Sequence, residues 1–254
     1  MARPVTALIL CGGRGSRMGG VDKPLERFQG RPLVQQVLDR IGPQVQGRVL
    51  ISANRHLDDY ARLGCPVLPD SLSDFQGPLA GLLAGLAYVN DPLHRPTAPQ
   101  THPSLPAGGD HWLLCVSGDS PWLPLDLVDR LWAVMARACS ATHTQPNADG
   151  QGARPDLSAQ GDTAVHHKKA PTDSAMALGR EAPDERLRSQ PLASLIHTRH
   201  QQSLADALAR GERRVEAWLR SLPLAEVPFD RPEDAFAFAN INDRSQLERL
   251  PPAS

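Results

Sequence analysis

Residues 6–25 read TALILCGGRGSRMGGVDKPL, an apolar run that ends in a glycine-rich, cationic loop. The run Leu8–Leu10 is typical of a parallel strand, because such strands are buried on both faces. Glycine tolerates positive φ and lets backbone N–H groups approach an anion closely. Arg14, Arg17 and Lys23 add positive charge, and arginine can bind phosphate through two parallel hydrogen bonds. The stretch predicts a strand followed by a nucleotide-phosphate loop.

Two better-known phosphate loops do not fit this stretch. A Walker loop ends in Gly-Lys and then Ser or Thr, whereas Gly20 and Val21 stand at the matching spacing after Gly15. A dinucleotide fingerprint needs a third glycine where Met18 stands, and it leaves Lys23 unexplained. The remaining alternative is a flexible turn with solvated charges. The strand, the cations and the Lys-Pro ending occur together, which favours the phosphate loop.

The composition is that of an ordinary globular chain. Its 254 residues, 41% hydrophobic and 22% charged, suffice for one large α/β domain or two small ones. The formal net charge of −1 gives no reason to expect nucleic-acid or membrane binding. No signal peptide precedes Thr6 and no apolar run approaches a membrane span, so we expect a cytoplasmic protein. Four cysteines lack disulfide or metal spacing and are expected to be reduced: Cys11, Cys65, Cys115 and Cys139.

Strand and helix patterns alternate along the first half of the chain. Pro32 opens one helix, and Gly42-Pro43 ends it. The ligand site of such α/β units lies beyond the carboxyl ends of the strands. We therefore expect an α/β protein with a mostly parallel central sheet. The expected strands are residues 8–10, 48–52, 66–68 and 112–117, and the expected helices are 32–41, 76–87 and 127–138.

Two segments interrupt this alternation. Residues 91–110 are rich in Pro, Thr, His and Gly, and they predict a surface excursion. Residues 140–185 have few branched or aromatic side chains and cannot bury enough surface to offset the entropy of ordering. We expect both to be poorly structured insertions in a single domain spanning residues 1–254. Further expectations are a strand or short helix at 188–197, a broken helical pair at 204–219, an edge strand at 227–229 and a helix at 245–250.

The stretch Leu10–Lys23 resembles the signature of the nucleotidyltransferases with a Rossmann-like fold, and within them that of the molybdenum cofactor guanylyltransferases. Cys11 stands where these proteins usually have alanine, a mild departure. Residues 77–81, 118–124 and 211–215 are also similar to segments of that family. The resemblance covers residues 6–139 and 188–250 and is weakest near the C-terminus. It implies a three-layer fold and transfer of GMP from GTP to the terminal phosphate of the molybdopterin cofactor, with release of pyrophosphate.

Nucleotidyl transfer needs a cationic loop around the triphosphate, a carboxylate for Mg²⁺ and groups that read the base. Asp119 directly follows an expected strand and is the candidate Mg²⁺ ligand; the alternative is that it caps the next helix. Arg17 and Lys23 are the candidates for neutralising phosphate charge. Asp22 is expected to orient the loop rather than to bind metal.

The resemblance also implies contacts with the nucleotide and the acceptor. Asn54 and Asp70 follow neighbouring strands and would read guanine or ribose. A carboxylate that accepts both N–H groups of guanine would reject adenine, and Asp74 remains a second candidate for that role beside Asp70. Asn240 and Asn242 match the family's Asn-Ile-Asn and would face the acceptor. The implied nucleotide-binding residues are Leu10, Cys11, Gly12, Gly13, Gly15, Lys23, Asn54, Asp70, Gly77 and Asp119.

The implied substrates are GTP and the molybdopterin cofactor, and molybdoenzymes or their chaperones are candidate partners. Three alternatives stay open. A cytidylyltransferase for the same cofactor shares the fold, as does a sugar-phosphate nucleotidyltransferase, although sugar enzymes usually have Ala-Ala-Gly before the loop and Pro-Lys after it. The third is a non-catalytic adaptor that inserts finished cofactor. Loss of Lys23 or Asp119 would indicate an adaptor, and this sequence retains both.

Overall fold

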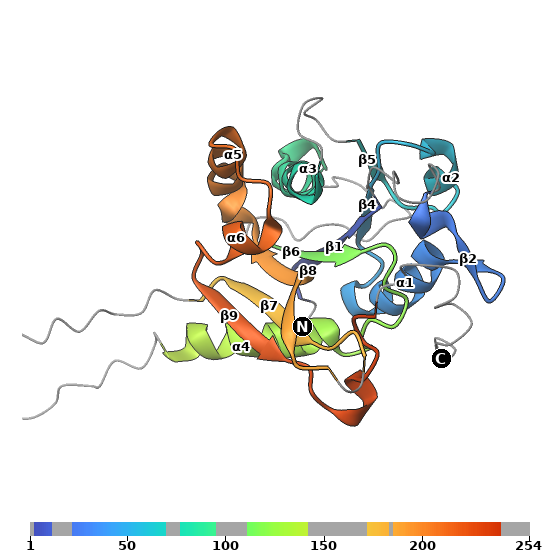
Figure 1. The fold of residues 1–254 in the computed structure, drawn as a ribbon. Helices are drawn as coiled ribbons and strands as arrows, with labels where there is room; N and C mark the ends of the chain where they lie inside the picture. Colours follow the sequence, from blue (N-terminus) through green and yellow to red (C-terminus); the bar gives the residue numbers. More distant parts are fainter. Residues whose placement is uncertain are drawn as a thin grey trace, which may run out of the picture.

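A seven-stranded sheet forms the centre of the molecule (Figure 1). The computed structural model describes residues 3–11, 22–69, 77–94, 111–141, 172–182 and 185–239. In spatial order the strands are β5 (Val67–Leu68), β4 (Val49–Ser52), β1 (Val5–Leu10), β6 (Trp112–Ser117), β8 (Arg188–His197), β7 (Ser174–Gly179) and β9 (Leu224–Pro228).

The sheet is mostly parallel, as predicted. The pairs β4–β5, β1–β4, β1–β6 and β7–β9 are parallel, and only β8 runs antiparallel to its two neighbours. The carboxyl ends of the other strands consequently lie at one edge of the sheet. A separate hairpin of β2 (Arg27–Phe28) and β3 (Arg31–Pro32) follows the first loop.

Helices cover both faces of this sheet and make three layers (Figure 1). One face is covered by α1 (Leu33–Ile41) and α4 (Leu127–Ala141), and the other by α3 (Pro78–Asn90), α5 (Gln201–Ala209) and α6 (Val215–Leu219). The short α2 (Leu57–Ala61) lies beside β5. The three-layer Rossmann-like architecture predicted from the sequence is confirmed. Among the described residues no helix combines the length and apolar character that a membrane crossing needs.

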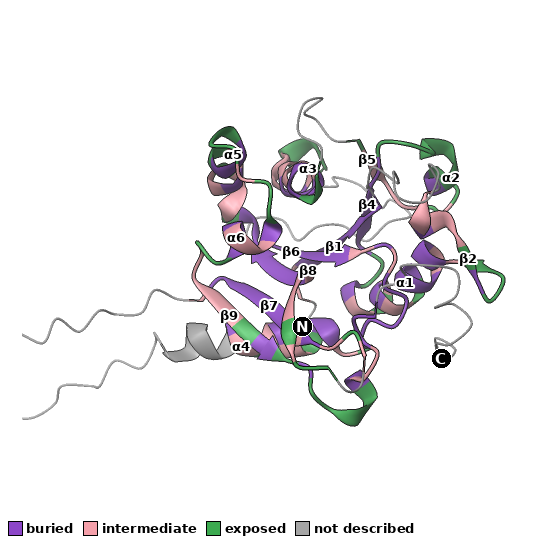
Figure 2. Cartoon of the chain, in the orientation of Figure 1, coloured by how far each residue is buried: buried purple, intermediate pink, exposed green. Residues whose placement is uncertain are grey.

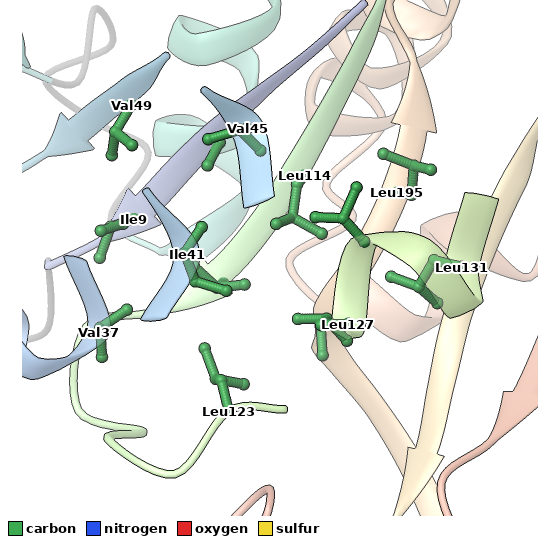
Figure 3. Packing of buried hydrophobic residues seen from close by; sticks show 14 of the residues in the cluster. Ile9, Val37, Ile41, Val45, Val49, Leu114, Leu123, Leu127, Leu131 and Leu195 are labelled. Carbon is green, nitrogen blue, oxygen red and sulfur yellow. The ribbon is translucent and has the colours of Figure 1, made fainter. Parts of the chain in front are cut away.

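β1 supplies side chains to both cores, because successive residues of a strand point to opposite faces. Ala7 and Ile9 belong to the core under α1 and α4, part of which Figure 3 shows around Ile9. Leu8 and Leu10 belong to the core under α3, α5 and α6. The central strands are buried almost throughout (Figure 2). A strand buried on both faces has a continuous apolar sequence, which is the pattern of residues 7–10.

The prediction that residues 140–185 are poorly structured is wrong at both ends of the segment. Helix α4 continues to Ala141, and β7 lies inside the segment, paired on both sides by β8 and β9. Its residues Ala175, Met176 and Ala177 are fully buried. The strand sequence SAMALG has no β-branched or aromatic residue, so its strand character comes from its neighbours rather than from propensity. Residues 95–110 and 142–171 lie outside the described residues.

The remaining C-terminal expectations have mixed outcomes. Residues 188–197 form a strand rather than a short helix, and β9 lies at the sheet edge, where Pro228 is tolerated. The helical pair α5 and α6 is confirmed, and it is interrupted at Gly211, whose φ of 92° suits glycine. The expected helix at 245–250 lies outside the described residues. The described 3-10 turns are η2 (Lys23–Leu25), η3 (Pro43–Val45), η4 (Pro92–His94), η5 (Thr198–His200) and η6 (Pro232–Asp234).

Candidate active site at the carboxyl edge of the sheet

The ends of β1, β4 and β6 meet at one edge of the sheet. The parallel register places Leu10 beside Ser52 on one side and Ser117 on the other. Just past the strands, the N–H of Cys11 donates to the Ser52 carbonyl at 2.8 Å, and the N–H of Gly118 donates to the Leu10 carbonyl at 3.0 Å. The loops that follow the three strands therefore start side by side, where open α/β sheets bind their ligands.

Gly118 allows the end of β6 to lie against the end of β1. A Cβ atom at this position would lie 2.7 Å from Cys11 Sγ and 3.2 Å from both the Leu10 carbonyl oxygen and Pro24 Cβ. Any larger residue would push the two strand ends apart. Packing therefore requires glycine directly before Asp119.

Lys23 and Asp119 form an ion pair at this edge. The Lys23 Nζ lies 2.7 Å from Asp119 Oδ2, and the two side chains are 27% and 17% exposed. The Ser117 hydroxyl donates to Asp119 Oδ1 at 2.5 Å. Both oxygens of the carboxylate are thus held by residues of the chain itself. The structure brings together the predicted phosphate-binding lysine and the predicted metal ligand, which are far apart in the sequence.

Asp119 does not cap a helix. Helix α4 begins only at Leu127, whereas a cap must directly precede the first turn. The alternative structural role considered for this residue is therefore wrong. Its contacts are those of the site edge, Lys23 and Ser117.

The donor set around Asp119 fits a magnesium site that substrate completes. Mg²⁺ keeps several waters and commonly binds one or two carboxylates together with substrate phosphates. In the part of the chain that the structure describes, no three His, Cys, Asp or Glu side chains gather into a site that would hold a metal by themselves. Asp119, held by the Ser117 hydroxyl, supplies one such carboxylate.

A polar cluster of Tyr60, Cys11 and the half-buried Asp22 adjoins Lys23 in the chain. The Tyr60 hydroxyl donates to Asp22 Oδ1 at 3.0 Å, and it is also in hydrogen-bonding contact with the Cys11 thiol. Tyr60 is fully buried and Cys11 is 3% exposed. Burial raises the pKa of the Cys11 thiol well above its usual value, and it raises the pKa of the Tyr60 hydroxyl as well. Both groups therefore stay protonated at neutral pH.

Sequence reasoning missed Tyr60. The short α2 carries it among exposed residues, and no spacing pattern shows which group its hydroxyl contacts. The one available signal was a tyrosine just after the Asn54 segment, in a chain with only two tyrosines. A buried tyrosine hydroxyl usually has a hydrogen-bond partner, but the sequence does not identify that partner.

A small aromatic cluster joins the segments that carry the site. The Phe28 and Trp122 rings lie 5.5 Å apart between centroids, and they pack with Leu33 and Ala239. Phe28 follows the Lys23 turn, Trp122 follows Asp119, and Ala239 directly precedes the predicted acceptor residue Asn240. Packing among these residues sets the separation of the three segments.

The other predicted site residues divide into placed and unplaced ones. Asn54 is exposed just past the end of β4, and Gly77 directly precedes the first turn of α3. Leu10 and Cys11 are buried at the end of β1. The predicted residues outside the described part of the chain are Gly12, Gly13, Gly15, Arg17, Asp70, Asp74, Asn240 and Asn242.

A three-layer fold with a lysine and an aspartate meeting beyond adjacent parallel strands defines the Rossmann-like nucleotidyltransferase class. Comparison with known families agrees, since the MobA-like NTP transferase domain matches residues 7–227. The chain is 36% identical over 247 residues to a molybdenum cofactor guanylyltransferase from Bordetella petrii, covering 97% of both chains. It is 39% identical over 250 residues to one from Ralstonia nicotianae, covering 97% of this chain and 95% of that protein. The chain belongs to the molybdenum cofactor guanylyltransferase family.

Solved structures share the fold at lower sequence identity. The molybdopterin-guanine dinucleotide biosynthesis protein A from Archaeoglobus fulgidus is similar with a TM-score of 0.60 at 16% identity, covering 96% of this chain and 95% of that one. A cytidylyltransferase from Leptospira borgpetersenii is similar with a TM-score of 0.57 at 12% identity, covering 99% and 89%. At such identities the likeness concerns the fold alone.

Proposed function

We propose that this protein transfers GMP from GTP to the terminal phosphate of the molybdopterin form of the molybdenum cofactor. The products are the guanine dinucleotide form of the cofactor and pyrophosphate. Membership of the family supports the reaction, and the observation that carries the site assignment is the Lys23–Asp119 contact beyond β1 and β6. That contact joins Lys23, which follows the glycine-rich stretch, to the Asp119 carboxylate, which follows β6.

The reaction needs no protein nucleophile. An oxygen of the acceptor's terminal phosphate attacks the α-phosphorus of GTP and forms the new P–O bond. The bond between the α-phosphorus and the bridging oxygen of the β-phosphate breaks, and its electron pair leaves with pyrophosphate. The protein contributes by positioning the two phosphates and by stabilising negative charge as it moves to the leaving group.

Lys23 and Asp119 have complementary roles in this proposal. The two side chains neutralise each other across 2.7 Å. With GTP bound, the Lys23 ammonium would donate to phosphate oxygens and the Asp119 carboxylate would hold Mg²⁺. Bound Mg²⁺ supplies further positive charge beside the phosphates. Ser117 keeps the Asp119 carboxylate oriented throughout.

The remaining roles follow from the predicted site residues. Arg17 joins Lys23 on the phosphates, Asp70 reads guanine, and Asn54 contacts the base or ribose. Asn240 and Asn242, which match the family's Asn-Ile-Asn, contact the acceptor. Free thiols at Cys11, Cys65 and Cys115 fit a reaction in the cytoplasm.

Pyrophosphate release and dinucleotide formation with purified molybdopterin and GTP, CTP or ATP test this proposal. Lys23→Ala and Asp119→Ala are each expected to lower transfer from GTP by about 10²-fold or more, the scale of losing one preorganised charged group. Arg62→Ala is the control. It removes an exposed positive charge at the end of α2 and should leave transfer unchanged. A preference for CTP would change the product assignment. Transfer in Asp119→Ala with unchanged Mg²⁺ dependence would exclude the proposed metal role.

A further inference from the structure

We infer that Tyr60 is a positioning residue for nucleotidyl transfer, acting through Asp22 on Lys23. The inference rests on the proposed function and deepens it at the same site. Tyr60 is fully buried and presents no surface to a ligand. Its effect on the reaction passes instead through the hydrogen bond from its hydroxyl to Asp22 Oδ1, at 3.0 Å.

The Asp22 carboxylate is committed to Tyr60 rather than to its own turn. Asp22 occupies the N-cap position of η2, where an aspartate side chain often accepts a hydrogen bond from the following N–H groups. Here its side chain makes no such capping bond. The carboxylate turns toward the interior and accepts the Tyr60 hydroxyl. A carboxylate partly removed from water needs such a donor.

The turn between Asp22 and Leu25 transmits this restraint to Lys23. The Leu25 N–H donates to the Asp22 carbonyl at 2.9 Å, and Pro24 is buried with its φ fixed by the ring. Lys23 therefore belongs to a short, stiff turn, and the side chain of Asp22 at the start of this turn is held by Tyr60. Its ammonium reaches Asp119 Oδ2 at 2.7 Å from that turn. A shift of the Asp22 anchor displaces the Lys23 backbone with it.

Tyr60 also connects two parts of the nucleotide site. It lies in α2, which starts just after the segment that carries Asn54, the candidate contact to base or ribose. Its hydroxyl reaches across to the residue that precedes Lys23. This hydrogen bond thus ties the segment between β4 and α2 to the turn that carries Lys23. Their separation sets where the Lys23 ammonium lies relative to the reacting phosphates once the nucleotide is bound.

Steady-state kinetics of Tyr60→Phe test this role. Phenylalanine fills the same buried space and removes only the hydroxyl. We expect kcat for transfer from GTP to fall roughly tenfold or more, because small misplacement of a reacting group is costly, whereas KM for GTP should change less than about threefold. Tyr88→Phe, at the only other tyrosine, is the matched control and should change neither constant. Equal kcat in Tyr60→Phe and wild type would overturn the inference, even if Tm fell.

Variants of Asp22 separate positioning from a general loss of stability. Asp22→Ala removes the acceptor and should lower kcat as much as Tyr60→Phe, while the double variant should lose no more than either single one, since both break one contact. Asp22→Asn keeps an oxygen that accepts the Tyr60 hydroxyl and should restore most of kcat. Additive losses, or no rescue by asparagine, would contradict the coupling. If wild type transfers no nucleotide, the proposed function itself has failed, an outcome distinct from active wild type with active Tyr60→Phe.

Discussion

At the scale of single residues, the site is built from charges that hold each other in place. Lys23 and Asp119 are each partly exposed, and pairs of that kind contribute only about 0–1 kcal/mol to folding. Their contact therefore matters for ligand binding more than for stability. Asp22 differs, because its carboxylate is drawn partly into the interior beside Tyr60.

The ionisation of Asp22 is expected to make stability depend on pH. Burial raises the pKa of the Asp22 carboxyl above the usual 3.8, so the folded protein binds this proton more tightly than the unfolded chain does. The resulting stability is present below the unfolded pKa and is lost as pH rises through the folded pKa. Asp22→Asn, which stays neutral, should have a higher Tm than wild type at pH 7, with a smaller advantage at pH 4.5. If the Tm advantage of Asp22→Asn grew on acidification, the pKa of Asp22 would be lowered, not raised, by folding. Asp39→Asn, at an exposed aspartate, controls for general charge effects.

At the scale of elements, close approach depends on glycines that face the sheet. Helix α3 packs on β1 through Gly81 and Gly85, and Gly118 brings the end of β6 against the end of β1. The helix expected at residues 76–87 is α3, which covers one face of the sheet. Gly77, which the family resemblance implies for nucleotide binding, directly precedes the first turn of the same helix.

Gly85→Ala is expected to destabilise the protein by about 1 kcal/mol. Alanine favours helix by about 1 kcal/mol over glycine, but overpacking a core costs about 1–3 kcal/mol. The new Cβ would lie 2.7 Å from Leu8 Cδ2 and 3.1 Å from Leu113 Cδ2. Urea denaturation measures the net effect, and Ala84→Gly in the same helix measures helix propensity at a half-buried position. A net stabilisation by Gly85→Ala would mean that α3 and β1 do not pack this tightly.

At the scale of the whole molecule, the segment that follows β9 packs against α4. Arg130 of α4 donates to Asp234 Oδ2 at 2.8 Å, and its guanidinium lies 3.7 Å from the centre of the Phe229 ring. Asp234 is 3% exposed. This contact holds residues 229–239 against α4, and the same segment ends at Ala239 beside the aromatic cluster.

Asp234→Ala is expected to lower the free energy of unfolding by about 3 kcal/mol, because it removes the buried carboxylate that pairs with the mostly buried Arg130. Asp126→Ala is the matched control. Asp126 is exposed and pairs with Arg130 and Arg231, so its loss should cost less than about 1 kcal/mol. If the two substitutions had equal effects in thermal or urea unfolding, the buried Arg130–Asp234 pair would not be what stabilises this segment.

Much of the fold followed from local pattern. The apolar run before the glycine loop predicted β1, because a strand buried on both faces is apolar throughout. The spacing of apolar residues after Pro32 predicted α1, because the buried side of a helix repeats every three to four residues. β7 was not predicted, because its sequence has no such pattern. Its small side chains carry little local preference, and it is a strand because β8 and β9 supply hydrogen bonds on both sides.

The sequence by itself determined the fold class, the family resemblance and the identities of Lys23 and Asp119 as site candidates, since each depends on residue types at short spacing. Only the tertiary structure decided that these two side chains meet, that Asp119 caps no helix, and that Tyr60 anchors Asp22. The physical reason is that such contacts join residues on different strands and helices. Their distances are set by how the elements pack, and no local sequence pattern encodes that packing.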